Sequence, residues 1–188
     1  MNIFDNIYGI LFKPNETFAH LANKRFFASS FLIIFSLAIL NALKNSVAFD
    51  TGNGSAWLLL IINTILYLLV WTISGVFITL TADLLGGSGK ITDTMIGLAY
   101  STLPLMFIPP LYMLTLAMGD FGENFYSIVK VLILLWVLFL AVLSLKYSHQ
   151  FHTTQAILSL VSLLFIIILF VVGISTVSFL GTILAISL

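Results

Sequence analysis

The chain has 188 residues, of which 61% are hydrophobic and only 7% are charged. A soluble domain typically carries about 25% charged residues, so this composition predicts a protein whose main solvent is the lipid bilayer. Seven basic and seven acidic residues balance to a net charge of zero, which argues against nucleic acid as a partner. Because the chain has no cysteine, disulfides, thiolate metal sites and cysteine nucleophiles are excluded.

The pattern of apolar and polar residues in 1–25 predicts a pair of amphipathic helices before the first apolar stretch. Pro14 separates the two helices, and basic residues flank the second. One apolar face is formed by Ile3, Phe4, Ile7, Tyr8 and Leu11 and is resumed by Phe18, Leu21 and Ala22. Two interpretations stay open: a cytoplasmic, interfacial segment lying on the membrane, or an amphipathic tail packed on the helix bundle.

Five apolar stretches are long enough to cross a bilayer, which takes about 20 residues. They cover about 26–43, 57–85, 94–118, 128–145 and 154–173. An apolar tail, 174–188, is short for a sixth span and could instead extend the fifth helix, lie in the interface or re-enter the membrane. Residues 26–188 therefore predict an all-α, polytopic transmembrane bundle of five spans.

The distribution of basic residues predicts the orientation in the membrane. With five spans and an inner N-terminus, the inner segments hold Lys13, Lys24, Arg25, Lys90 and Lys146, and the outer ones hold only Lys44 and Lys130. Because basic residues favour the cytoplasmic side, we expect a cytoplasmic N-terminus.

The sequence offers no set of catalytic residues. No acidic, basic or histidine side chain lies deep in a predicted span, which argues against a proton-driven pump. No serine has a G-x-S-x-G context, and no H-E-x-x-H motif is present. We therefore expect a protein that is not an enzyme and needs no cofactor or metal.

The end of the second predicted span carries a carboxylate and a glycine-rich connection. Asp83 lies at the membrane interface near a helix C-terminus, where it needs a partner such as Lys90 or Lys146. Gly86 and Gly87 open a Gly-Gly-Ser-Gly segment that allows a sharp reversal of the chain. We favour a turn, with Thr92 or Asp93 capping the next helix; the alternative is a phosphate or headgroup cradle that uses Lys90.

Three prolines interrupt the third predicted span. Pro104, Pro109 and Pro110 remove backbone donors, so a kink or break is expected. Tyr100 and Ser101 are among the nearby polar residues that could satisfy the freed carbonyl groups or line a cavity. A packing kink and a functional cavity both remain open.

Two histidines, His149 and His152, follow the fourth predicted span at a spacing of three residues. This spacing can place two imidazoles on one helical face for a metal ion. Because no carboxylate or cysteine accompanies them, we favour a position at the level of the lipid headgroups, beside Lys146 and Tyr147.

Several segments together resemble the Yip (Ypt/Rab-interacting) family of multi-span membrane proteins. They are Phe12-Lys13-Pro14 with Thr17-Phe18, Asp83-Leu84-Leu85-Gly86-Gly87, Gly97-Leu98-Ala99-Tyr100-Ser101-Thr102-Leu103-Pro104, and Ser148-His149 through Gln155-Ala156-Ile157. The resemblance implies five spans and a cytoplasmic N-terminus. Eukaryotic members act with Rab-type GTPases in traffic between the endoplasmic reticulum and the Golgi apparatus. This chain lacks their long hydrophilic arm and their Asp-Leu-Tyr-Gly-Pro motif, so it resembles the compact prokaryotic form and a Rab-type partner is not expected.

Two functional hypotheses follow. The first is a non-enzymatic scaffold or adaptor that binds membrane lipids and another membrane protein, or a second copy of itself, and organises the membrane or its traffic. The second is a passage protein for a lipid or a small neutral solute, with a cavity at the proline-broken third span. The membrane would be the cell membrane in a prokaryote and that of the endoplasmic reticulum or Golgi apparatus in a eukaryote.

Overall fold

The computed structural model describes residues 3–21, 26–48 and 53–163, and all the regular secondary structure in those ranges is helical. Its helices are α1 (Ile3–Phe12), α2 (Pro14–Leu21), α3 (Phe27–Ala48), α4 (Asn53–Leu84), α5 (Ile91–Ser101), the 3₁₀ helix η1 (Leu103–Phe107), α6 (Ile108–Leu116) and α7 (Asp120–Ser148). A further helix, Thr153–Leu163, follows α7. The prediction of an all-α protein is confirmed.

Four segments within the described residues are long and apolar enough to cross a membrane. They are Phe27–Asn45, Leu60–Leu84, the composite Ile91–Leu116 and Phe121–Ser148. The predicted fifth span, 154–173, lies only partly within the described residues, and the tail 174–188 lies outside them. The chain is therefore a multi-pass integral membrane protein.

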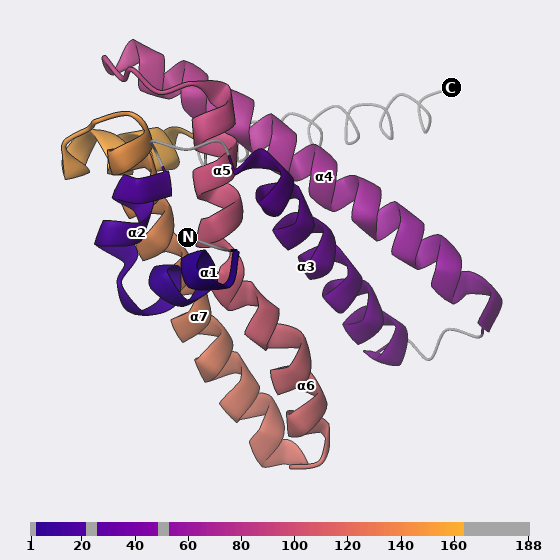
Figure 1. Ribbon diagram of the computed structural model, residues 1–188. Helices are drawn as coiled ribbons and strands as arrows, with labels where there is room; N and C mark the ends of the chain where they lie inside the picture. Colours follow the sequence, from indigo (N-terminus) through magenta and orange to yellow (C-terminus); the bar gives the residue numbers. More distant parts are fainter. Residues whose placement is uncertain (1–2, 22–25, 49–52, 164–188) are drawn as a thin grey trace, which may run out of the picture.

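The composite segment α5–η1–α6 is the centre of the bundle, with α3 and α7 against it and α4 on the outside of α3 and α5 (Figure 1). In the most apolar stretch of this segment 61% of the residues are buried, against 17% in Leu60–Leu84. Much of the apolar surface of α4 therefore faces outward from the described part of the bundle, as suits contact with lipid.

The bundle has two ends that differ in construction. The His149 end is where α4 connects to α5 and where α7 finishes. The Gly119 end is the tight hairpin between α6 and α7, at the bottom of Figure 1. Both α4 and α7 finish near the His149 end with a left-handed residue beyond the last turn: Gly86 with φ +85° and Gln150 with φ +56°.

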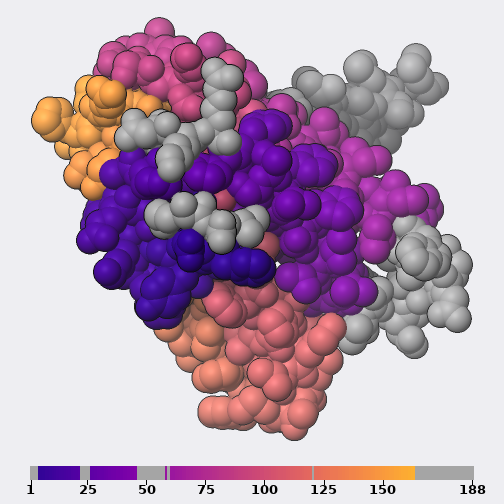
Figure 2. Space-filling view, viewed as in Figure 1, coloured from indigo at the N-terminus to yellow at the C-terminus, as the bar shows by residue number. Residues whose placement is uncertain are grey.

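Helices α1 and α2 fold against the side of the bundle. Ile10, Phe18 and Leu21 are buried in one cluster with residues of α3, α5, η1 and α7. Gly9 allows the two helices to approach closely, since a side chain there would collide with Thr17. Figure 2 shows the indigo surface of α1 and α2 spread over this face of the molecule.

Of the apolar face that the sequence pattern identified on α1, Phe4 and Tyr8 point outward, whereas Ile7 packs against the core. Phe4, Tyr8 and Phe12 are exposed by 78%, 62% and 68%, whereas Asn6 and Ile10 are fully buried. The segment is therefore packed on the bundle through one face and presents an aromatic stripe, Phe4, Tyr8 and Phe12, on the other.

The helix bounds differ from the predicted spans for local reasons. Helix α7 begins at Asp120, well before residue 128, because the chain reverses at Gly119, whose φ is +58°. Helix α5 begins at Ile91, where the Asp93 carboxylate accepts a hydrogen bond of 3.2 Å from the Lys90 backbone N–H. Acidic side chains in a first turn also match the helix dipole.

Candidate functional site

The Gly86–Lys90 connection packs directly on the end of α7. Helix α4 ends with the Gly87 N–H donating to the Ala82 carbonyl oxygen at 2.9 Å and the Gly86 N–H donating to that of Asp83 at 3.1 Å. This pair of bonds is the Schellman pattern, which requires the positive φ that Gly86 has. The turn interpretation therefore describes the geometry of this segment.

His149 is the centre of this end of the molecule. Its side chain is 1% exposed and is therefore enclosed by protein, while its predicted depth at the level of the lipid headgroups stays a prediction. Its Nδ1 accepts a hydrogen bond of 3.2 Å from the Gly89 backbone N–H, and its Nε2 lies 2.8 Å from the Thr94 Oγ1. Phe151 stacks on the ring at a centroid distance of 5.4 Å. His149 thus joins the end of α7 to the start of α5.

The hydrogen bonds around His149 have a definite direction. Because Nδ1 accepts from Gly89, the neutral ring carries its proton on Nε2 and donates it to Thr94. The Thr79 hydroxyl donates to the Gly75 carbonyl oxygen at 2.7 Å.

The Thr79 hydroxyl also donates to the Thr94 Oγ1 at 2.8 Å, so its proton is shared between two acceptors. The Thr94 hydroxyl donates in turn to the Lys90 carbonyl oxygen at 3.3 Å. We call the chain Gly89–His149–Thr94–Thr79–Gly75 the His149 relay. It links α7, α5 and α4 through buried polar groups, each of which has a partner.

Burial lowers the pKa of His149 below its usual 6.5, and the carboxylates of Asp83 and Asp93 act in the opposite direction. A protonated ring would carry a proton on Nδ1, which would then face the Gly89 N–H. The relay therefore requires neutral His149.

Further contacts stabilise the same junction. The Gln155 Nε2 donates to the Leu85 carbonyl oxygen at 3.0 Å, and the Gln155 Oε1 accepts from the His152 N–H at 3.1 Å. Gly87 and Gly89 allow close approach, because a Cβ on either would come within 3 Å of the His149 ring. The Gly-Gly segment thus meets His149 and Gln155, both of which are distant from it in sequence.

The other predicted residues at this end lie on its surface. Asp83 is exposed and forms no ion pair within the described residues, so the expected contact with Lys90 or Lys146 is not found. Lys90 is exposed and, with Asp93, lines a cavity of about 350 Å³ between the α4–α5 connection and the end of α7. His152 is exposed, and no group of three His, Cys, Asp or Glu side chains suited to a metal occurs in the described ranges.

The break in the third segment is filled by protein. Pro104 lies in η1, and Pro109 in the first turn of α6, where a missing N–H costs least. Both are buried, whereas Pro110 is exposed. The Tyr100 hydroxyl is 2.9 Å from the Ser29 Oγ of α3, and the Ser101 hydroxyl donates to the Leu98 carbonyl oxygen at 2.7 Å. The Tyr100–Ser29 contact joins α5 to α3, whereas the Ser101 bond lies within α5.

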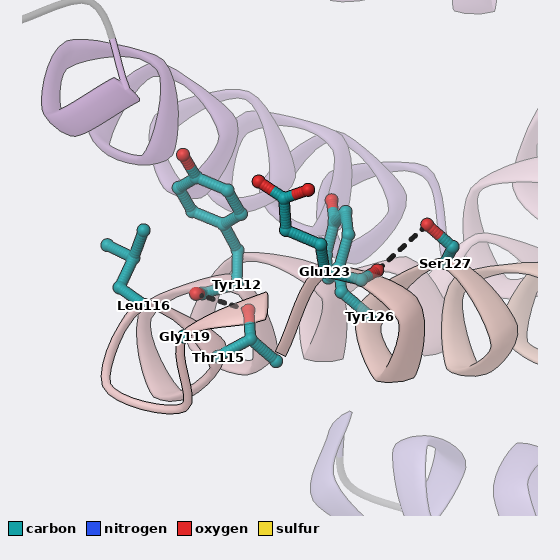
Figure 3. A pocket seen from close by; sticks show the side chains of 7 residues that line it. All are labelled: Tyr112, Thr115, Leu116, Gly119, Glu123, Tyr126 and Ser127. Carbon is teal, nitrogen blue, oxygen red and sulfur yellow. Dashed lines mark hydrogen bonds between the residues drawn. The ribbon is translucent and has the colours of Figure 1, made fainter. Parts of the chain in front are cut away.

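A second polar site lies at the Gly119 end and was not identified from the sequence. It is a cavity of about 490 Å³ between α6 and α7, drawn in Figure 3. Its lining consists of Tyr112, Thr115, Leu116, Gly119, Glu123, Tyr126 and Ser127. The sequence feature that could have identified this site is the spacing of Glu123, Tyr126 and Ser127, which places them on one face of α7.

Comparison with known proteins adds one finding. The family model for the Yip1 domain matches residues 8–174, which is most of the chain and includes every residue of the His149 relay. No curated protein and no solved structure matches the chain.

Proposed function

The chain belongs to the Yip family of membrane proteins, and on this basis we propose that it is a non-enzymatic membrane scaffold or adaptor that binds another membrane protein through α1. The observation that carries this proposal is the aromatic stripe Phe4, Tyr8 and Phe12, which is exposed on a helix whose other face is anchored in the core. Exposed apolar patches of this kind typically mark interaction sites.

The depth of α1 supports a partner within the membrane. Ile10 is buried in the same cluster as Leu103 and Leu140. Leu140 lies eight residues before Ser148, or roughly 12 Å along α7. The stripe would therefore lie near the level of the interface or the adjoining acyl chains, where aromatic side chains are favoured.

We further propose that the His149 end and residues 1–25 face the cytoplasm, as the distribution of basic residues favours. In this proposal residues 26–188 form the membrane domain. A Rab-type GTPase is not the proposed partner, because the sequence motif associated with that role is missing. Passage of a lipid or solute is the alternative, but its only support is the break at η1, which side chains fill.

The test is a matched pair of aromatic double variants. Tyr8→Ser with Phe12→Ser removes two contacting rings of the stripe, 4.8 Å apart. Phe121→Ser with Phe125→Ser removes a similar exposed pair, 6.2 Å apart, on α7. After crosslinking in native membranes and purification, we expect the first variant to lose a stoichiometric membrane partner and the second to retain it.

Both variants should insert in the membrane as the wild type does, because none of the four rings is buried. Equal partner recovery from the two variants would contradict a role for α1. Recovery of lipid alone from the wild type would contradict the adaptor proposal and favour passage, to be tested next by flux in reconstituted vesicles.

A further inference from the structure

The cavity at the Gly119 end has a rigid frame. Gly119 adopts a positive φ of +58°, which lets α6 and α7 turn back on each other. Gly122 brings the first turn of α7 against the end of α6, since a Cβ there would collide with the Thr115 carbonyl oxygen. Both glycines are needed for the cavity to have this shape, so its walls are set by the backbone.

The cavity combines a carboxylate with two aromatic rings. Figure 3 shows the side chains of Tyr112, Glu123 and Tyr126 pointing the same way, away from the hairpin backbone. The two tyrosine rings contact edge to face at a centroid distance of 5.5 Å. Glu123 is exposed, and its carboxylate has no hydrogen-bond or ion-pair partner within the described part of the chain. A carboxylate beside tyrosine rings is the environment that binds an organic ammonium group.

A basic residue lies at the adjoining edge. The Lys130 Nζ is 5.9 Å from the centre of the Tyr126 ring, two helical turns from Glu123 and on the same face of α7. Positive and negative side chains are therefore separated by roughly 10 Å along the helix, with a tyrosine between them.

The position along α7 places this arrangement in the headgroup layer. Eighteen residues separate Lys130 from Ser148, which is roughly 27 Å of helix and close to the thickness of the hydrocarbon core, about 30 Å. Lys130 thus lies at one membrane interface, and Glu123 lies farther out among the headgroups.

We propose that this cavity binds the headgroup of a zwitterionic phospholipid. Glu123, Tyr112 and Tyr126 hold the ammonium group, and Lys130 contacts the phosphate nearer the hydrocarbon core. The order of charges along α7 matches the order in the lipid, in which the phosphate joins the glycerol and the ammonium lies at the tip. The site does not depend on α1, on the identity of a protein partner or on which side of the membrane the Gly119 end faces.

The test uses the full chain purified in detergent and titrated with short-chain lipids, with binding followed by native mass spectrometry. Phosphatidylethanolamine and phosphatidylcholine carry the ammonium, whereas phosphatidylglycerol has the phosphate without it. We expect the wild type to prefer the first two lipids and Glu123→Gln to bind them about tenfold more weakly, without a loss of phosphatidylglycerol binding. Lys130→Gln should weaken all three lipids.

Glu16→Gln is the matched control, because it removes an exposed carboxylate of α2 on another part of the molecule, and it should keep the preference. Glu123→Asp retains the negative charge and should therefore retain part of the preference for phosphatidylethanolamine and phosphatidylcholine. A wild type without preference, or a preference kept by Glu123→Gln, would overturn the proposal. Free phosphoethanolamine binding as tightly as the lipid would overturn the assignment to a lipid.

Discussion

The two polar ends of the bundle are built on opposite principles. At the His149 end, the side chains of His149, Thr94 and Thr79 are buried, and they form hydrogen bonds with one another and with the backbone. At the Gly119 end, Glu123 is exposed beside an open cavity and has no partner in the described residues. A closed polar network fixes the positions of helices, whereas an open group remains available to a ligand. The contrast predicts that substitutions at the first end change stability and those at the second change binding.

The largest expected effect is that of His149→Ala. The substitution leaves a cavity and deprives the Gly89 N–H and the Thr94 hydroxyl of a buried partner. We expect the free energy of unfolding to fall by about 2–4 kcal/mol, measured by SDS titration in mixed micelles.

His152→Ala is the control for this variant, because it removes the same side chain three residues away at an exposed position. Its effect should stay within about 0.5 kcal/mol. Equal effects of the two substitutions would mean that the His149 relay does not hold the helices together.

Next in size is Thr94→Val, which removes one hydroxyl and nearly preserves the shape of the side chain. The His149 Nε2–H then has no acceptor, and the Thr79 hydroxyl loses one of its two acceptors. We expect a loss of about 1–3 kcal/mol in the free energy of unfolding.

Thr72→Val provides the comparison, because the Thr72 hydroxyl bonds only to the Leu68 carbonyl oxygen on an exposed face of α4. A relay that acts as a unit would also make Thr94→Val and His149→Ala non-additive in a double-variant cycle. Additive effects would contradict coupling between the two residues.

The relay also predicts a dependence of stability on pH. His149 in the folded protein has a pKa below 6.5, whereas in the unfolded chain its pKa is near 6.5. The unfolded state therefore binds the proton first as the pH falls, so stability is full above about pH 6.5. It declines between that pH and the folded pKa, by at most about 1.4 kcal/mol per pH unit.

His149→Gln is the variant that isolates this effect. A glutamine can accept from Gly89 and donate to Thr94 but does not titrate in this range. We expect its stability curve, followed by thermal unfolding between pH 5 and pH 8, to be flatter than that of the wild type. Parallel curves would show that another group causes the decline.

Much of the fold follows from the sequence, because composition and apolar length are local properties. The small residues Ala38 and Ala42 are buried in α3, and the Asn63 Nδ2 donates to the Ala38 carbonyl oxygen at 2.8 Å, between helices. Asn41, by contrast, bonds within its own helix, to Leu37.

The two polar sites could be predicted only in part, because each depends on residues that are distant in sequence. His149 follows Lys146 and Tyr147, and this polar context suggested a position at the level of the lipid headgroups. Its burial depends on Gly89 and Thr94, which contact it from another part of the chain. Likewise, the Tyr112–Tyr126 contact exists only because the chain reverses at Gly119.

The smallest expected change in stability is that of Glu123→Gln, and it sharpens the contrast between the ends. The carboxylate is exposed and the substitution preserves its size, so the free energy of unfolding should change by no more than about 0.5 kcal/mol in detergent without added phospholipid. With saturating phosphatidylethanolamine the wild type should gain stability, because a ligand that binds only the folded state shifts the equilibrium toward it, and the variant should gain less. A variant that is destabilised without lipid would place Glu123 among the structural groups, like His149, and the two ends would no longer differ in kind.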